Sequence, residues 1–247
     1  MKILVCISKT PDTTAKITFT DNNTKFNEQG IQFIINPSDE WYALVRALEL
    51  KEKSGGTVTL ISVGGAAYDP VIRKALALGA EDAVRINADS SDSYFVALQI
   101  AGFAKDGGYD LIMTGKETID YNGAGVGGMI AGIMGLPFIS LATKLETDGK
   151  GEAEFHREIE GGEEICAVKL PVVISCTKGM AEQRIPNMRG IMAARTKPLK
   201  VVEPVEAEKL TEIISFELPE AKTGIKTIEA DNVEELVRLL HEEAKVI

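Results

Sequence analysis

Short apolar runs alternate with segments of helical periodicity through the first half of the chain. Four apolar runs have the continuous pattern of strands buried on both faces of a parallel sheet, and they cover residues 3–7, 57–63, 83–86 and 110–114. A helical pattern follows each run, starting near Ser38, Pro70, Ser93 and Met129. This alternation predicts an α/β fold with an open, mostly parallel, doubly wound (Rossmann-like) sheet and helices on both faces. Ser38 or Asp39 is the expected cap of the first helix.

Three apolar segments in the middle of the chain follow one another without an intervening helical pattern. They cover residues 139–145, 165–170 and 172–176, and a charged stretch at 152–164 lies among them. Because turns join these segments, we expect an antiparallel portion added to the sheet.

The character of the sequence changes after the last of these segments. Residues 180–200 mix basic side chains with scattered apolar ones, residues 203–227 are irregular, and residues 231–246 predict a final amphipathic helix. We therefore divide the chain into a domain at 1–177 and a tail at 178–247. A tail without an obvious core of its own either packs on its own domain or wraps around a partner subunit. The composition does not decide between these two possibilities.

Charge and composition narrow the classes of function. The 247-residue chain carries 27 basic and 37 acidic side chains, for a net charge of −10. An acidic surface repels phosphate backbones, so nucleic acid is not expected as a partner. No apolar run approaches the roughly 18 residues that a membrane-spanning helix needs, so no membrane span is expected. The opening apolar run is too short for a signal peptide.

Few residues are available for covalent or metal chemistry. Cys6, Cys166 and Cys176 fit no disulfide framework, which favours a reducing compartment. The sequence has no Cys-x-x-Cys or His-x-x-x-His pair, so a metal site of that kind is not expected. Nothing in it forms a set of nucleophile, base and orienting residue. The sequence therefore favours a binding or carrier role, with no catalytic residue.

A candidate site follows from the predicted sheet, because doubly wound sheets bind ligands beyond the carboxyl ends of their strands. The residues expected there are Cys6, Ser8, Asn36, Val63, Gly64 and the loop at 115–128. In that loop, Gly123, Gly125 and Gly128 spell G-x-G-x-x-G. The loop follows the fourth strand, whereas the dinucleotide fingerprint directly follows the first, so we do not interpret it as that fingerprint.

The same loop can still bind an anion. The amides of Ala124, Gly125 and Val126 stand at a predicted helix start, where free N–H groups point at negative charge. The alternative is a glycine-rich helix start that serves only close packing, and this alternative stays open. Asp120 with Asn122 can bind a ribose hydroxyl or cap a helix.

Several segments, in their order along the chain, resemble the beta subunit of electron transfer flavoproteins. The most specific is the charged stretch 157–164 with its acidic-glycine turn, followed by the proline and apolar strand of 169–173. Further matches lie at 5–7, 11–13, 36–37, 75–80, 115–116, 119–120 and 186–194. The resemblance extends over essentially the whole chain.

The resemblance implies a heterodimer with an alpha subunit that holds the redox FAD, while the beta subunit binds AMP. Together they would carry electrons from acyl-CoA dehydrogenases to a quinone oxidoreductase, and the tail of the beta subunit would wrap the alpha subunit. The phosphate of AMP would lie on the amides of residues 124–126. The implied AMP contacts are Cys6, Ser8, Asn36, Pro37, Ser38, Asp39, Val63, Gly64, Gly115, Lys116, Ile119, Asp120, Asn122, Gly123, Ala124, Gly125, Val126 and Gly127.

The resemblance also implies a set of docking residues. Met188 lies where the family's recognition loop anchors the dehydrogenase with an exposed apolar side chain, and Arg184 and Ile191 flank it. Glu158 matches the acidic residue that orients the mobile FAD domain of alpha. Thr13 stands where some members place an aromatic residue near the flavin.

Two alternative functions remain beside the simple carrier. Ala124 and Val126 stand where AMP-binding carriers usually show Asn and Thr, and electron-bifurcating members show Ala and Val there. The bifurcating alternative holds a second FAD in this pocket and oxidises NADH, although Gly128-Met129 is more similar to the carrier type. The third possibility is a stand-alone adenine-nucleotide module resembling universal stress proteins. A bacterial cytoplasmic location is expected, and the mitochondrial matrix is also compatible.

Overall fold

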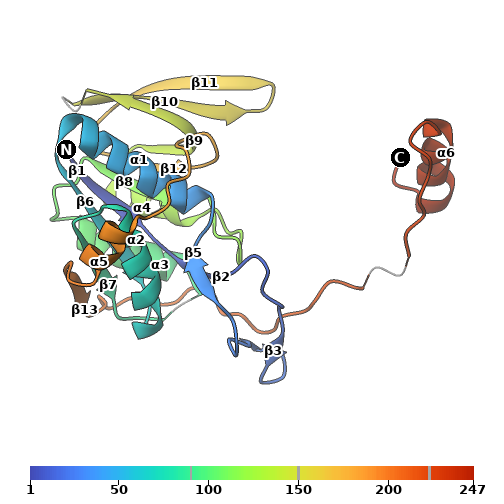
Figure 1. The fold of residues 1–247 in the computed structure, drawn as a ribbon, viewed down its shortest axis with the longest axis horizontal. Helices are drawn as coiled ribbons and strands as arrows, with labels where there is room; N and C mark the ends of the chain where they lie inside the picture. The colour runs from blue at the N-terminus through green and yellow to red at the C-terminus, as the bar shows by residue number, and fades with distance from the viewer. Residues whose placement is uncertain (90, 149–150, 222–223) are drawn as a thin grey trace.

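The computed structural model describes residues 1–89, 91–148, 151–221 and 224–247. Its centre is a mixed nine-stranded sheet in the order β11-β10-β9-β12-β8-β1-β6-β7-β13 (Figure 1). The four strands expected from the apolar runs are adjacent and parallel. They are β1 (Lys2–Cys6), β6 (Thr57–Val63), β7 (Asp82–Ile86) and β8 (Leu111–Gly115). The predicted α/β class and its mostly parallel sheet are confirmed.

Helices cover both faces of this sheet. They are α1 (Asp39–Ser54), α2 (Asp69–Leu78), α3 (Ser93–Ala104) and α4 (Val126–Met134), with a short 3₁₀ turn, η1 (Ala66–Tyr68), before α2. One apolar core holds α1 and α2 against Ile3 and Val5, and the other holds α3 and α4 against Leu4. Successive strand residues point to opposite faces, so a strand buried on both faces is mostly apolar along its whole length.

The start of α1 differs from the prediction. Ser38 gives α1 no side-chain cap among the described residues and adopts a φ of 69°. The Asp39 carboxylate instead accepts hydrogen bonds from the Glu117 amide and the Thr177 hydroxyl, both at 3.4 Å. These partners belong to segments that reach α1 only in the folded chain, which is why the local pattern missed them.

The middle of the chain forms β9 (Phe138–Thr147), β10 (Glu152–Ile159), β11 (Gly162–Lys169) and β12 (Val172–Cys176). The expected antiparallel portion is present as β9, β10 and β11. The prediction was wrong for β12, which lies between β8 and β9 and is parallel to both. All five of its residues are buried, because β12 returns from the hairpin to the centre of the sheet.

The charged stretch at 152–164 contains β10. Ala153 and Phe155 are 3% and 0% exposed, whereas Glu152 and Glu154 face solvent. This alternation has the period of a strand with one solvated face.

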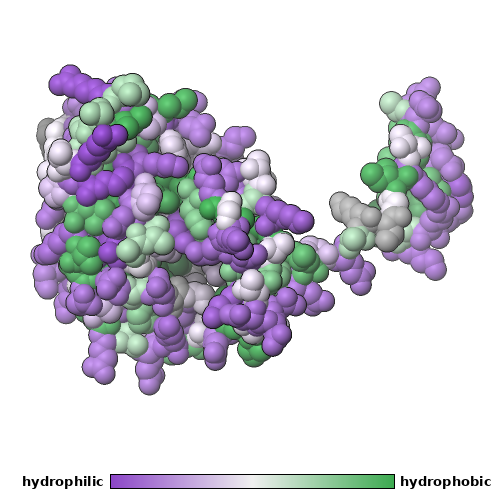
Figure 2. Space-filling model, turned by 60° about the horizontal axis from the view of Figure 1, so that its bottom comes forward, coloured by the Kyte–Doolittle hydropathy of each residue, from purple (hydrophilic) through white to green (hydrophobic). Residues whose placement is uncertain are grey.

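The tail is partly attached to the domain and partly free of it. The helix α5 (Met188–Ala194) packs on α2, and β13 (Leu199–Val202) adds a parallel strand beside β7. The last helical segment, α6 (Val233–Leu239), continues in a π-turn, η2 (Leu240–Ala244), away from the domain (Figures 1 and 2). The first part of the tail therefore packs on its own domain, and wrapping of a partner by the last part stays a prediction.

The stretch between β1 and α1 carries two small antiparallel ribbons. One pairs β2 (Lys9–Pro11) with β5 (Phe33–Ile35), and the other pairs β3 (Phe19–Thr20) with β4 (Lys25–Phe26). Within the described ranges, no helix is long and apolar enough to cross a membrane.

Candidate functional site

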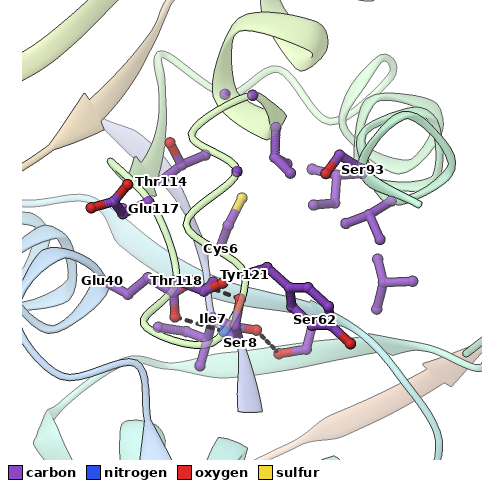
Figure 3. Close-up of a pocket in the computed structure, with 18 of the residues that line it drawn as sticks. Cys6, Ile7, Ser8, Glu40, Ser62, Ser93, Thr114, Glu117, Thr118 and Tyr121 are labelled. Atoms are coloured by element: carbon purple, nitrogen blue, oxygen red, sulfur yellow. Dashed lines mark hydrogen bonds between the residues drawn. The ribbon is translucent and has the colours of Figure 1, made fainter. Parts of the chain in front are cut away.

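A cavity lies at the carboxyl ends of β1, β6 and β8, where the sequence predicted a site (Figure 3). One wall is the loop between β8 and α4, and the opposite wall is the start of α3. The predicted residues that line it are Cys6, Ser8, Val63, Gly115, Lys116, Asp120, Gly123, Ala124, Gly125, Val126 and Gly127.

The start of α4 presents backbone N–H groups to this cavity. Gly125 precedes the helix and has no side chain to cap it, so the first amides of α4 lack an intrahelical acceptor. Ala124 holds a left-handed φ of 47°, which turns the chain into the helix. Such an end attracts an anion through its N–H groups and through the helix dipole.

The glycines of this loop serve different purposes. A Cβ on Gly127 would lie 2.8 Å from the Thr114 hydroxyl and 3.1 Å from the Phe138 ring, so this glycine serves close packing. Around Gly123 and Gly125 the nearest atoms would lie at 3.7 Å and 3.4 Å. Gly127 therefore fits the close-packing interpretation of the loop. Gly123 and Gly125 leave the space that a ligand would need to approach the backbone.

The floor of the cavity holds a buried acid that the sequence analysis missed. Glu40 is 4% exposed, and its two carboxyl oxygens contact the Ser8 amide at 2.7 Å and the Ser8 hydroxyl at 2.6 Å (Figure 3). Burial raises the pKa of Glu40 to about 8, against the lowering effect of the Ser8 hydrogen bonds. Glu40 is therefore mostly neutral at pH 7.

Residues 36–39 brace the loop from behind. The Asn36 side chain donates to the Glu117 carbonyl at 2.8 Å and accepts from the Ile119 amide at 3.0 Å. A Cβ on Gly115 would lie 2.8 Å from the Glu40 side chain, so the loop lies directly on the first turn of α1.

Seven predicted site residues do not line the cavity; they are Asn36, Pro37, Ser38, Asp39, Gly64, Ile119 and Asn122. The Gly64 carbonyl accepts from the buried Arg85 guanidinium at 2.9 Å. Asn122 closes a turn, with its amide donating to the Thr118 carbonyl and a φ of 50°. Ile119 lines an adjoining outer chamber.

Several lining residues lay outside the prediction, among them Glu40, Ser62, Ser93 and Thr114 (Figure 3). Tyr68 is another. Ser93 begins α3 and Thr114 lies within β8, so the rule that placed the site at strand ends and helix starts also pointed to them. Ser62 donates to the Ile7 carbonyl at 2.6 Å, which ties β6 to β1 beside the cavity.

The thiol that lines the cavity is a weak nucleophile. Burial raises the pKa of the Cys6 thiol well above its usual range, and the nearby Glu40 carboxyl adds to the effect. A thiol in that state stays protonated at neutral pH. Among the described residues, no group of three or more His, Cys, Asp or Glu is placed to hold a metal ion.

The predicted docking residues lie on separate surfaces. Met188 and Ile191 are 73% and 40% exposed on α5, and Arg184 precedes them. The Arg184 guanidinium donates to both carboxylate oxygens of Glu52, at 2.7 and 3.1 Å. The backbone carbonyl of Arg184 accepts a hydrogen bond from the Trp41 indole at 3.1 Å. These contacts attach the segment before α5 to α1.

The other two docking residues lie elsewhere. Glu158 is exposed near the end of the β10–β11 hairpin, paired across the strands with Glu163. Thr13 lines the outer chamber beside the cavity. The structure of the chain alone does not bring these two residues near Met188.

The sequence model of one protein family matches most of the chain. The Electron transfer flavoprotein domain matches residues 23–207. The chain is 37% identical to the electron transfer flavoprotein subunit beta of Bacillus subtilis (strain 168), covering 100% of both chains. It is also 37% identical to the subunit beta of Syntrophomonas wolfei subsp. wolfei, over 92% of this chain and 89% of that one. It is 31% identical to the caffeyl-CoA reductase-Etf complex subunit CarD of Acetobacterium woodii, over 81% and 78% of the two chains.

Proposed function

This chain belongs to the electron transfer flavoprotein family as a beta subunit, an electron-carrier subunit whose name implies an alpha partner, and we propose that it binds AMP in the cavity at the start of α4. The observation that carries the proposal is the row of amides at residues 124–126, which line the cavity and have no hydrogen-bond acceptor among the described residues. The partial positive charge of these N–H groups complements the negative charge of a phosphate.

The rest of the cavity supports one orientation of the nucleotide. Asp120 also lines the cavity, and its carboxylate repels a phosphate, so we expect the phosphate at the helix start. A ribose hydroxyl can donate to the Asp120 carboxylate. Val63, Val96 and Ile100 supply apolar surface for the base.

The electron path runs through the partner. We propose that the alpha subunit holds the redox FAD, and that the heterodimer takes electrons from acyl-CoA dehydrogenases and delivers them to a quinone oxidoreductase. Met188 is the proposed anchor for the dehydrogenase, because a 73% exposed methionine beside Ile191 can enter an apolar pocket of a partner. Glu158 orients the FAD domain of alpha, and Thr13 lies near the flavin.

We propose that residues 1–177 form the nucleotide-binding domain and residues 178–247 supply the recognition loop and the arm around alpha. The exposed apolar residues of α6 support the arm, since Val233, Leu236 and Val237 are 43–60% exposed there. Apolar side chains of this kind gain free energy when a partner covers them. Two bacterial relatives support a location in the bacterial cytoplasm.

A count of bound nucleotides tests the proposal. The heterodimer, purified with its alpha partner and denatured, is expected to release one FAD and one AMP. Val126→Pro removes one donor amide at a helix position that tolerates proline, and we expect AMP affinity to fall by about tenfold. Val126→Ala keeps the amide and is the matched control. Release of FAD without AMP, or equal affinity in both variants, contradicts the AMP site.

A second candidate is the electron-bifurcating class, in which a second FAD replaces AMP and NADH is oxidised. Two observations favour it: the relative CarD belongs to a caffeyl-CoA reductase-Etf complex, and the cavity adjoins an outer chamber of about 780 Å³. The same nucleotide count separates the two, because two FAD per heterodimer would assign this class.

A further inference from the structure

We propose that two segments far apart in the sequence, a flap (residues 12–32) and a strap (residues 203–216), form a clasp that sets the rate at which the nucleotide enters and leaves the cavity. The flap carries β3 and β4, and the strap follows β13. This inference rests on the proposed AMP site, and its test separates the two.

The cavity opens outward into a chamber that the flap and the strap enclose. The cavity and the chamber share Lys9, Tyr68, Ser91, Asp120 and Tyr121 as lining residues. Beyond this ring, the chamber is lined by flap residues on one side and by Lys209 and Phe216 of the strap on another. A nucleotide that leaves through this opening passes between the two segments.

The strap is attached to α3, which forms one wall of the cavity. Asp92 caps α3 by accepting from the Phe95 amide at 2.6 Å, and its other oxygen accepts from strap residues. Those donors are the Leu210 amide at 2.9 Å and the Thr211 amide and hydroxyl, both at 2.6 Å. One buried carboxylate therefore connects the end of α3 with the strap.

A second attachment lies about two turns further along α3. The Gln99 side chain donates to the Val205 carbonyl and accepts from the Val205 amide, both at 2.8 Å. Gln99 is 1% exposed, so breaking this pair leaves buried polar groups without partners. The start of the strap is thus held firmly to the domain.

The free ends of the flap and strap meet in one contact. The rings of Phe19 and Phe216 stack with centroids 4.9 Å apart and planes 8° apart, and the Phe216 amide donates to the Asn23 carbonyl at 2.7 Å. Figure 1 shows the tail passing beside the β3 hairpin before it leaves the domain. The contact has few members, so it can open while the anchors on α3 and the base of the flap stay in place.

The base of the flap is closed by the backbone. The Asp12 amide donates to the Gln32 carbonyl at 2.8 Å, which brings the two ends of the flap together. A loop closed at its base moves as a unit when its tip is released. Loss of the Phe19–Phe216 stack therefore leaves only the Phe216–Asn23 backbone hydrogen bond of the contact described above, and loosens the flap without unfolding the sheet.

The test measures the release of radiolabelled AMP from the complete heterodimer in the presence of excess unlabelled AMP. We expect Phe216→Ala and Phe19→Ala each to speed release by about three- to tenfold, the range that an aromatic pair supports. The double variant is expected to be no faster than the faster single variant, because the two rings act through one contact. Leu218→Ala, a 53% exposed residue just beyond the strap, is the matched control and is expected to release AMP as the unmodified protein does.

The outcomes separate the clasp from the AMP site. Release rates within twofold of the unmodified protein in both phenylalanine variants would overturn the clasp while leaving the AMP site intact. An unmodified heterodimer that contains no AMP would overturn the proposed function instead. Where a phenylalanine variant does not assemble, Thr211→Val, which removes one donor to Asp92, takes its place with the same expected direction.

Discussion

At the scale of single residues, Glu40 makes a buried acid part of the cavity floor. Its pKa of about 8 in the folded chain lies above the ordinary value of 4.5, so unfolding releases a proton at any pH between them. Stability therefore falls as the pH rises through this window, by on the order of 5 kcal/mol in total. We expect Glu40→Gln to abolish this pH-dependent loss of stability. The melting temperature of the variant should therefore rise relative to that of the unmodified heterodimer as the pH increases from 5 to 8.

The comparison needs a control for the general effect of pH on the heterodimer. Glu152→Gln changes an exposed glutamate with no proposed role and is expected to follow the unmodified protein at each pH. Melting curves of the Glu40→Gln variant that run parallel to those of the unmodified protein would show that Glu40 is charged in the folded chain.

At the scale of elements, α5 and the segment before it form a rigid mount for Met188. The Glu52–Arg184 ion pair and the Trp41 hydrogen bond hold this segment on α1, and α5 itself packs on α2. We expect Met188→Ala to leave the heterodimer and its flavin unchanged but to weaken electron acceptance from the dehydrogenase. A loss of about 1–3 kcal/mol corresponds to roughly 5- to 150-fold in kcat/KM.

Rapid mixing of reduced dehydrogenase with the heterodimer measures this transfer. Ile214→Ala is the matched control, because Ile214 is 83% exposed and lies on the strap, outside the docking segment. Unchanged transfer in the Met188→Ala variant would remove Met188 as the anchor.

At the scale of the whole molecule, the tail divides into an attached part and a free part. α5, β13 and the strap contact the domain, whereas the segment that carries α6 extends from it (Figures 1 and 2). We expect a chain ending at Glu220 to keep its domain but to bind alpha at least about tenfold more weakly, because burial of α6 residues such as Leu236 contributes roughly 1.5–3 kcal/mol each.

Analytical ultracentrifugation over a dilution series measures the dissociation of that heterodimer. Circular dichroism of the shortened chain is expected to retain the signal of the sheet, since β13 and the strap remain. A heterodimer of unchanged affinity would show that α6 does not contact alpha.

The sequence by itself determined the central strands, the helices between them and the position of the cavity. Local periodicity decides which segments form strands and helices, and parallel strands place their carboxyl ends at one edge. The family was also evident from ordered segments such as 157–164 and 169–173. These features depend on neighbouring residues, so they can be inferred without knowing what lies across the fold.

Only the tertiary structure decided which residues meet across long separations. Glu40 reaches the cavity because Ser8, 32 residues away, lies against it in the folded chain. Asn36 braces the loop through its side-chain amide, and β12 returns to the centre of the sheet. Phe19 and Phe216 stack although nothing in their local sequences marks them as partners. Such contacts follow from the packing of whole elements, which no local pattern records.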